Sequence, residues 1–120
     1  HQGVKARQES GKLMVQKIKE IAAGYPVICV GDFNSTPETE QIETMQSLLK
    51  DTYQVTEMPP YGPVGTFNGF DFNAPMKQRI DYIFVSPSVR VLKYGVLTDS
   101  KSQRYPSDHQ PVVAKIVIGK

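Results

Sequence analysis

The sequence predicts an α/β fold in which residues 1–120 form a single domain segment. Its length fits one small domain and leaves no room for a second of ordinary size. Hydrophobic residues make up 39% of the chain and charged residues 22%, which is enough apolar material for a core and too little charge for a disordered segment. The third observation is the order of the patterns, which runs helix, strand, helix, loop and then three strands.

The first helix is expected over residues 5–23, because apolar side chains recur three and four positions apart there. Gly24 supplies a helix stop. The following run, residues 26–31, is apolar and rich in β-branched side chains, which predicts a buried strand.

The second helix is expected over residues 37–49. Ser35 and Thr36 offer capping hydroxyls, Pro37 suits the first helical position, and Glu38 places a negative charge near the positive end of the helix dipole.

The remainder divides into a loop and three strands. Residues 51–78 are rich in Pro, Gly, Asn and aromatic side chains, which predicts a long irregular loop, and such loops are usually functional or mobile. Strand composition returns at residues 79–85, 89–97 and 112–118.

Composition excludes several classes of protein. Fourteen Lys and Arg against twelve Asp and Glu give a net charge of +2, too small for the basic field of a dedicated nucleic-acid binder. The single cysteine, Cys29, excludes an intrachain disulfide and a multi-cysteine zinc site, and its apolar surroundings favour an inert buried thiol. No run reaches the length of a membrane span. The chain begins with His1 rather than Met, so an export signal could lie upstream and the compartment stays open.

The first candidate site is the sequence Gly-Asp-Phe-Asn at residues 31–34, at the end of the first predicted strand. Catalytic groups in α/β sheets gather at such strand ends. In an extended backbone Asp32 and Asn34 point to one side and Phe33 to the other. The alternative is a turn or a helix cap, which is the commoner role of an isolated Asp-x-Asn.

The second candidate is Asp81, a carboxylate inside an apolar strand. A buried charge costs several kcal/mol unless it is paired. Arg79, two residues away on the same face, is one possible partner, and His109 is another. If His109 is the partner, the carboxylate would fix the imidazole tautomer and raise its basicity.

The third candidate is the sequence Ser-Asp-His at residues 107–109. In an extended segment Asp108 and His109 face opposite ways, so His109 needs a different carboxylate and Asp108 is left to bind a cation. A serine-hydrolase reading is disfavoured, because Ser107 lacks a Gly-x-Ser-x-Gly elbow and three successive residues cannot align as a relay. Two histidines and one distant cysteine also give no zinc-ligand spacing.

Taken together, three motifs closely resemble the endonuclease/exonuclease/phosphatase family of metal-dependent phosphoesterases. They are GDFN at 31–34, RIDYIF at 79–84 and SDHQPV at 107–112. The opening residues 1–10 resemble the segment leading into a family helix, and residues 65–70 resemble a loop that some members place over the substrate.

The resemblance implies half of a four-layered α/β/β/α sandwich, with mostly antiparallel or mixed sheets and outer helices. Family domains are about twice this length, so the chain looks like the C-terminal portion, whose missing partner is the N-terminal half. The family's N-terminal Asn and metal-binding Glu, and a histidine just upstream of His1, have no counterpart here. We therefore expect the isolated fragment to be inactive.

The resemblance also implies roles for the candidate residues. Asp32 would orient or deprotonate the attacking water and help hold a metal, and Asn34 would hold the water and the phosphate. Asp81 would be the partner of the catalytic His109, and Asp108 would be a metal ligand. Phe67 and Asn68 would join Asn34 in binding substrate.

The activity implied is hydrolysis of phosphate esters, by a phosphodiesterase, nuclease or phosphatase that depends on Mg²⁺ or Mn²⁺. Residues 31–37 resemble the version found in poly(A)-shortening nucleases and many bacterial members, which slightly favours nucleic acid as substrate. The competing hypothesis is a non-catalytic binding or assembly module derived from the same fold.

The strands carry a further expectation. Residues 82–85 suggest strands covered on both faces, whereas this chain supplies helices for only one. The other face would then be apolar and exposed, which predicts self-association.

Overall fold

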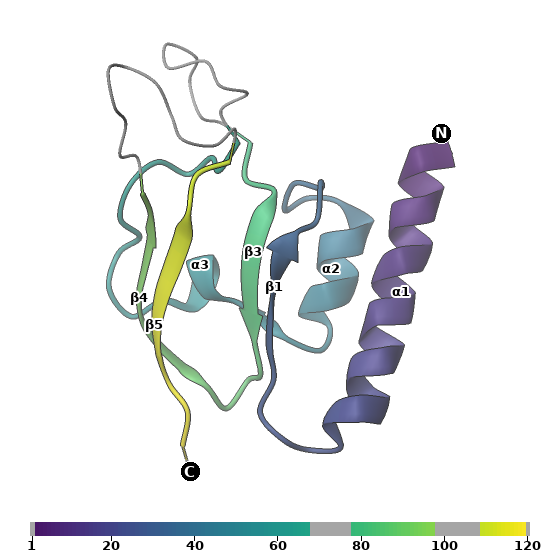
Figure 1. Ribbon diagram of the computed structural model, residues 1–120, viewed down its shortest axis with the longest axis horizontal. Helices are drawn as coiled ribbons and strands as arrows, with labels where there is room; N and C mark the ends of the chain where they lie inside the picture. The colour runs from purple at the N-terminus through teal and green to yellow at the C-terminus, as the bar shows by residue number, and fades with distance from the viewer. Residues whose placement is uncertain (1, 68–77, 98–108, 120) are drawn as a thin grey trace.

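A computed structural model of the chain describes residues 2–67, 78–97 and 109–119 (Figure 1). The elements, in chain order, are α1 (Gln2–Ala22), β1 (Ile28–Asp32), α2 (Glu40–Gln46), β2 (Lys50–Asp51), α3 (Thr52–Val55), β3 (Asp81–Val85), β4 (Arg90–Val96) and β5 (Val112–Val117).

The strands form two antiparallel groups. One sheet has the order β1-β3-β2, and the other is the β4–β5 pair. Figure 1 shows α1 and α2 on one side of β1 and β3, and the β4–β5 pair on the other side. The predicted α/β class with mainly antiparallel strands is therefore confirmed.

The main core lies between the helices and the first sheet. Phe33 packs edge-on against both Tyr82 and Phe84, with ring centroids 5.6 and 5.3 Å away. α1 approaches α2 closely at Gly11, where an added Cβ would lie 3.1 Å from the side chain of Gln41. The buried members of this core are Phe33, Ile42, Met45, Leu49, Tyr82 and Phe84.

A buried ion pair ties the middle of the chain to the start of β3. The Arg79 guanidinium lies 2.8 Å from an Asp51 carboxylate oxygen, and the two side chains are 3% and 0% exposed. The rings of Tyr53 and Tyr82 lie 4.3 and 4.9 Å from the guanidinium carbon. Asp51 also caps α3 by accepting a hydrogen bond from the Tyr53 N–H. Removal of either charge would leave the other one buried and unpaired.

Two predictions of secondary structure need correction. The second helix begins at Glu40 and not at Pro37, because Thr39 is its extended N-cap and its hydroxyl bonds back to the Thr36 carbonyl in a preceding turn. Residues 51–78 are not one irregular loop, since β2 and α3 occupy its first part. Propensity alone misses them because the Asp51–Arg79 pair, which is distant in sequence, holds them in place.

The expectation that β1 is buried is also wrong for this chain. Ile28 and Val30 are 45% and 68% exposed, whereas Cys29 between them is half-buried against the helices. Burial raises the pKa of the Cys29 thiol, which keeps it protonated and poorly nucleophilic at neutral pH. None of the helices within residues 2–67, 78–97 and 109–119 has the length and apolarity needed to cross a bilayer.

Replacing Asp51 by Ala should destabilise the fold by about 3–5 kcal/mol, because it leaves the buried Arg79 guanidinium without its ion-pair partner. Urea unfolding would measure the loss. The control is Glu57→Ala, which breaks the exposed pair with Arg90 and should leave the unfolding midpoint close to that of the parent. Similar midpoints for the two variants would contradict the assigned role of the buried pair.

Candidate active site

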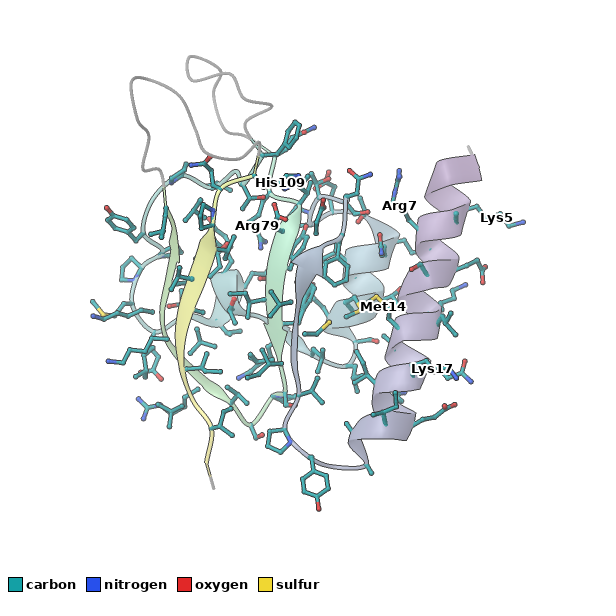
Figure 2. All side chains as sticks on the ribbon, viewed as in Figure 1. Lys5, Arg7, Met14, Lys17, Arg79 and His109 are labelled. Atoms are coloured by element: carbon teal, nitrogen blue, oxygen red, sulfur yellow. The ribbon has the colours of Figure 1, made fainter. Side chains whose placement is uncertain are left out.

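The antiparallel register of β1 and β3 places two acids opposite each other. Asp32, the last residue of β1, pairs with Asp81, the first residue of β3. His109 lies just before β5 and forms an isolated antiparallel bridge with Phe67. Three segments distant in sequence therefore meet at one end of the sheet (Figure 2, where His109 is labelled).

The imidazole of His109 lies between the two carboxylates. Its Nδ1 is 2.7 Å from Asp81 Oδ2, a hydrogen bond, and its Nε2 is 3.6 Å from Asp32 Oδ2. The side chains of His109 and Asp81 are 28% and 18% exposed, and that of Asp32 is 47% exposed. The ring is thus oriented from the protein side by Asp81 and faces the more open carboxylate with its other nitrogen.

Asp81 was left with two possible partners by the sequence, and the structure distinguishes them. Arg79 is engaged with Asp51, and Asp81 bonds to His109 instead.

Asn34 adopts a turn and not the extended backbone, and the sequence had left both geometries open. Its φ is +49°, a left-handed conformation, and its N–H donates to Asp32 Oδ1 at 2.7 Å. The alternative reading of Asp-x-Asn as a turn is therefore correct for the backbone, since asparagine tolerates this conformation better than most residues. The turn still leaves the two residues close together, because Asp32 and Asn34 both line the same cavity.

That cavity has a volume of about 290 Å³. It opens beside β1 and β3 and receives side chains from α1, from the β1–α2 connection and from the segment before β5. Its lining residues are Arg7, Asp32, Asn34, Ser35, Thr36, Thr39, Phe67, Gln78, Ile80 and His109.

Thr66 is a positioning residue that sequence reasoning missed. Its buried hydroxyl accepts hydrogen bonds from the N–H groups of Ile80 and Asp81, at 3.1 and 3.2 Å. Its carbonyl accepts from the Gln110 N–H at 2.6 Å. One residue thus ties the start of β3 to the residue after His109. The only signal for it is its place in the Gly-Thr-Phe-Asn segment.

Phe67, predicted to bind substrate, lines the cavity and packs edge-on against the His109 ring, with centroids 5.3 Å apart. Asn68, predicted as its companion, and Asp108, predicted as a metal ligand, lie outside the described residues.

A second hydroxyl fixes the loop that carries Asn34. The Tyr82 phenol lies 2.7 Å from the Ser35 carbonyl and 3.0 Å from the Arg79 carbonyl. Burial raises the pKa of Tyr82, so the phenol stays protonated and can donate. The Ser35 hydroxyl in turn donates to Gln41 Oε1 on α2.

Asp32, Asp81 and His109 form a group able to hold a metal ion, with one ligand atom from each lying within 4.8 Å of the others. Carboxylate oxygens are the donors that Mg²⁺ and Mn²⁺ prefer, so the donor set fits these ions. Because Nδ1 of His109 is bonded to Asp81, the nitrogen left for a ligand is Nε2, on the Asp32 side.

Comparison with known proteins identifies the class. A model of the endonuclease/exonuclease/phosphatase family matches residues 9–109. The chain therefore belongs to the endonuclease/exonuclease/phosphatase family, as its three motifs indicated. A search of curated protein sequences gave no match.

Solved structures agree with this assignment. Mannosyl-6-phosphatase Bt3783 of Bacteroides thetaiotaomicron VPI-5482 is 42% identical, with a TM-score of 0.86 over 95% of this chain and 46% of that chain. A second family protein from Bacteroides thetaiotaomicron is 41% identical, with a TM-score of 0.85 over 93% of this chain and 45% of that one. The human Nocturnin catalytic domain, at 24% identity and a TM-score of 0.70 over 95% of this chain and 42% of that one, shares the fold.

The chain thus spans less than half the length of the structures it matches. Together with the antiparallel sheets and flanking helices, this coverage confirms the predicted fold class, half of a four-layered α/β/β/α sandwich.

Replacing Asp81 by Ala should remove the constraint on which ring nitrogen of His109 carries the proton. With Asp81 present, the neutral ring keeps its proton on Nδ1, because the carboxylate accepts it. Nitrogen-15 NMR of the histidine ring should show mainly this tautomer in the parent and a mixture in the variant. Asp32→Ala is the control, since it leaves the Asp81 bond in place; a mixture in the parent itself would refute the assignment.

Proposed function

We propose that this chain carries about half of the active site of a divalent-metal-dependent phosphoesterase. The observation that supports the proposal most is the convergence of Asp32, Asp81 and His109 at one sheet end, with both ring nitrogens of His109 facing carboxylates. Family membership supports hydrolysis of phosphate esters as the reaction class.

The position of each residue suits it to a different role in the proposed reaction. Asp81 holds the Nδ1 proton, so Nε2 of His109 can accept a proton from, or return one to, a group in the cavity. Asp32 is the more exposed carboxylate, suited to orienting an attacking water, and the Asn34 amide can donate to a phosphoryl oxygen.

The two carboxylates of the site repel an anion, so a bound cation would help the site to accept a phosphate. Asp32, with Asp108 as a further expected ligand, would hold Mg²⁺ or Mn²⁺ there. The metal would neutralise charge on the phosphoryl oxygens and favour formation of the nucleophile.

We propose a phosphomonoester as the substrate class, since a 42% identical relative is a mannosyl-6-phosphatase. This shifts the weight away from nucleic acid, which the Gly-Asp-Phe-Asn motif slightly favoured.

The remaining part of the site would come from a second half of the domain. The matched structures are about twice as long as this chain, and β1 and β5 carry exposed apolar side chains that a second sheet would cover. These are Ile28, Val30, Val113 and Val117, each between 43% and 68% exposed. By "complete domain" we mean this chain joined to that half.

The complete domain should hydrolyse mannose 6-phosphate in the presence of Mg²⁺ and lose turnover when a chelator is added. Phosphate release would be measured for mannose 6-phosphate, bis(p-nitrophenyl) phosphate and single-stranded RNA. Turnover that survives chelation would remove the metal from the proposal, and cleavage of RNA alone would replace the phosphatase with a nuclease.

Replacement of His109 by Ala tests the site itself. In the complete domain the value of kcat should fall by about a hundredfold or more, as expected for loss of a general acid–base group. The unfolding midpoint should stay near that of the parent. Equal losses of activity and stability would make His109 a structural residue.

The chain without its other half should self-associate through the exposed apolar residues of β1 and β5. Light scattering across a concentration series should show a mass that rises above 13.4 kDa. Val30→Lys should lower the rise, whereas Leu13→Lys, at a 55% exposed position on α1, should not. A monomer at all concentrations would contradict this expectation.

A further inference from the structure

Arg7 is a cationic side chain in the active-site cavity to which no role has yet been given. It lies near the start of α1 and lines the cavity together with Asp32, Asn34 and His109. It also lines an adjoining hollow with Asp32 and Asn34. Figure 2 shows Arg7 and His109 at the same end of the molecule, with the end of β1 between them.

The charge of Arg7 is not used elsewhere in the described part of the chain. None of the ion pairs among residues 2–67, 78–97 and 109–119 involves it. Arg79, the other arginine near the site, is held by Asp51 in the core and cannot serve a ligand. Of the described residues that line the cavity, Arg7 is the one Lys or Arg.

A guanidinium in this position is suited to phosphate. Its planar donors match two phosphoryl oxygens at once, and it stays charged at every physiological pH. A side chain kept half-buried beside a cavity, without an ion-pair partner there, gains most from an anion that enters the cavity.

We propose that Arg7 binds the non-bridging oxygens of the substrate phosphate and selects phosphomonoesters over phosphodiesters. A monoester is close to a dianion at pH 7, since its second pKa is about 6, whereas a diester carries one charge. A diester also has one fewer unesterified oxygen to offer the guanidinium. The inference rests on the proposed function, which names phosphomonoesters as the substrate class, and extends it to the residue that selects them.

The test compares matched aryl esters in the complete domain, p-nitrophenyl phosphate as monoester and bis(p-nitrophenyl) phosphate as diester. Arg7→Gln should lower kcat/KM for the monoester by about tenfold or more, as expected for a lost hydrogen bond to a charged group. The value for the diester should change by less than about threefold. Arg7→Lys should restore part of the loss, because it keeps the charge without the planar fork.

Lys5→Gln is the control. It removes one positive charge from the same helix, two residues away, and its side chain is exposed and points away from the cavity (Figure 2). A general effect of net charge would appear equally in both variants. Similar kinetics for Arg7→Gln and Lys5→Gln, or equal losses on the two esters, would overturn the inference about Arg7 while the proposed function survives.

A binding measurement tests the inference about Arg7 separately from the proposed function. Calorimetric titration with inorganic phosphate, in the presence of Mg²⁺, should show weaker binding to Arg7→Gln than to the parent and to Lys5→Gln. If the parent hydrolyses neither of these esters nor mannose 6-phosphate, the proposed function fails, and the titration still decides whether Arg7 binds phosphate. Equal affinities in all three proteins would refute it.

Discussion

The antiparallel pairing of β1 with β3 is the constraint on which the site depends. Its register sets Asp32 directly opposite Asp81, at a separation that brings two like charges together at one end of the sheet. Such a pair is unfavourable by itself. The imidazole of His109 lies between the two carboxylates, bonded to Asp81 and facing Asp32, and thereby offsets part of their repulsion. A shift by one residue would turn the side chains of β3 to the opposite face and break the group.

Two polar anchors hold that register in place from the core. Thr66 accepts from the N–H groups of Ile80 and Asp81 and, through its carbonyl, from Gln110, so one residue joins the start of β3 to the segment that carries His109. The buried pair of Arg79 and Asp51 fixes the residue two positions before Asp81. Burial of a full ion pair is an expensive way to gain stability. We interpret it as a device that specifies where β3 begins, with Asp81 facing His109.

The sequence predicted the parts of this arrangement that depend on local pattern. Periodicity located α1, and apolar runs located β1, β3, β4 and β5. The cost of burying a lone carboxylate also led to His109 as a candidate partner for Asp81. What it missed depends on contacts between distant residues: β2 and α3 need Arg79, and the role of Thr66 needs both β3 and Gln110. The backbone of Asn34 follows its local turn preference, which the sequence had offered as the alternative to an extended strand.

Strand β1 belongs both to the candidate site and to the exposed apolar face of the chain. Its end presents Asp32 to the cavity, where the proposed metal would bind, and its open face presents Ile28 and Val30 to solvent. A second sheet that packs on that face would cover these apolar side chains, and its strand ends would reach the same edge as Asp32. If one contact both covers the apolar face and completes the proposed ligand set, folding of the sandwich and assembly of the site would be coupled.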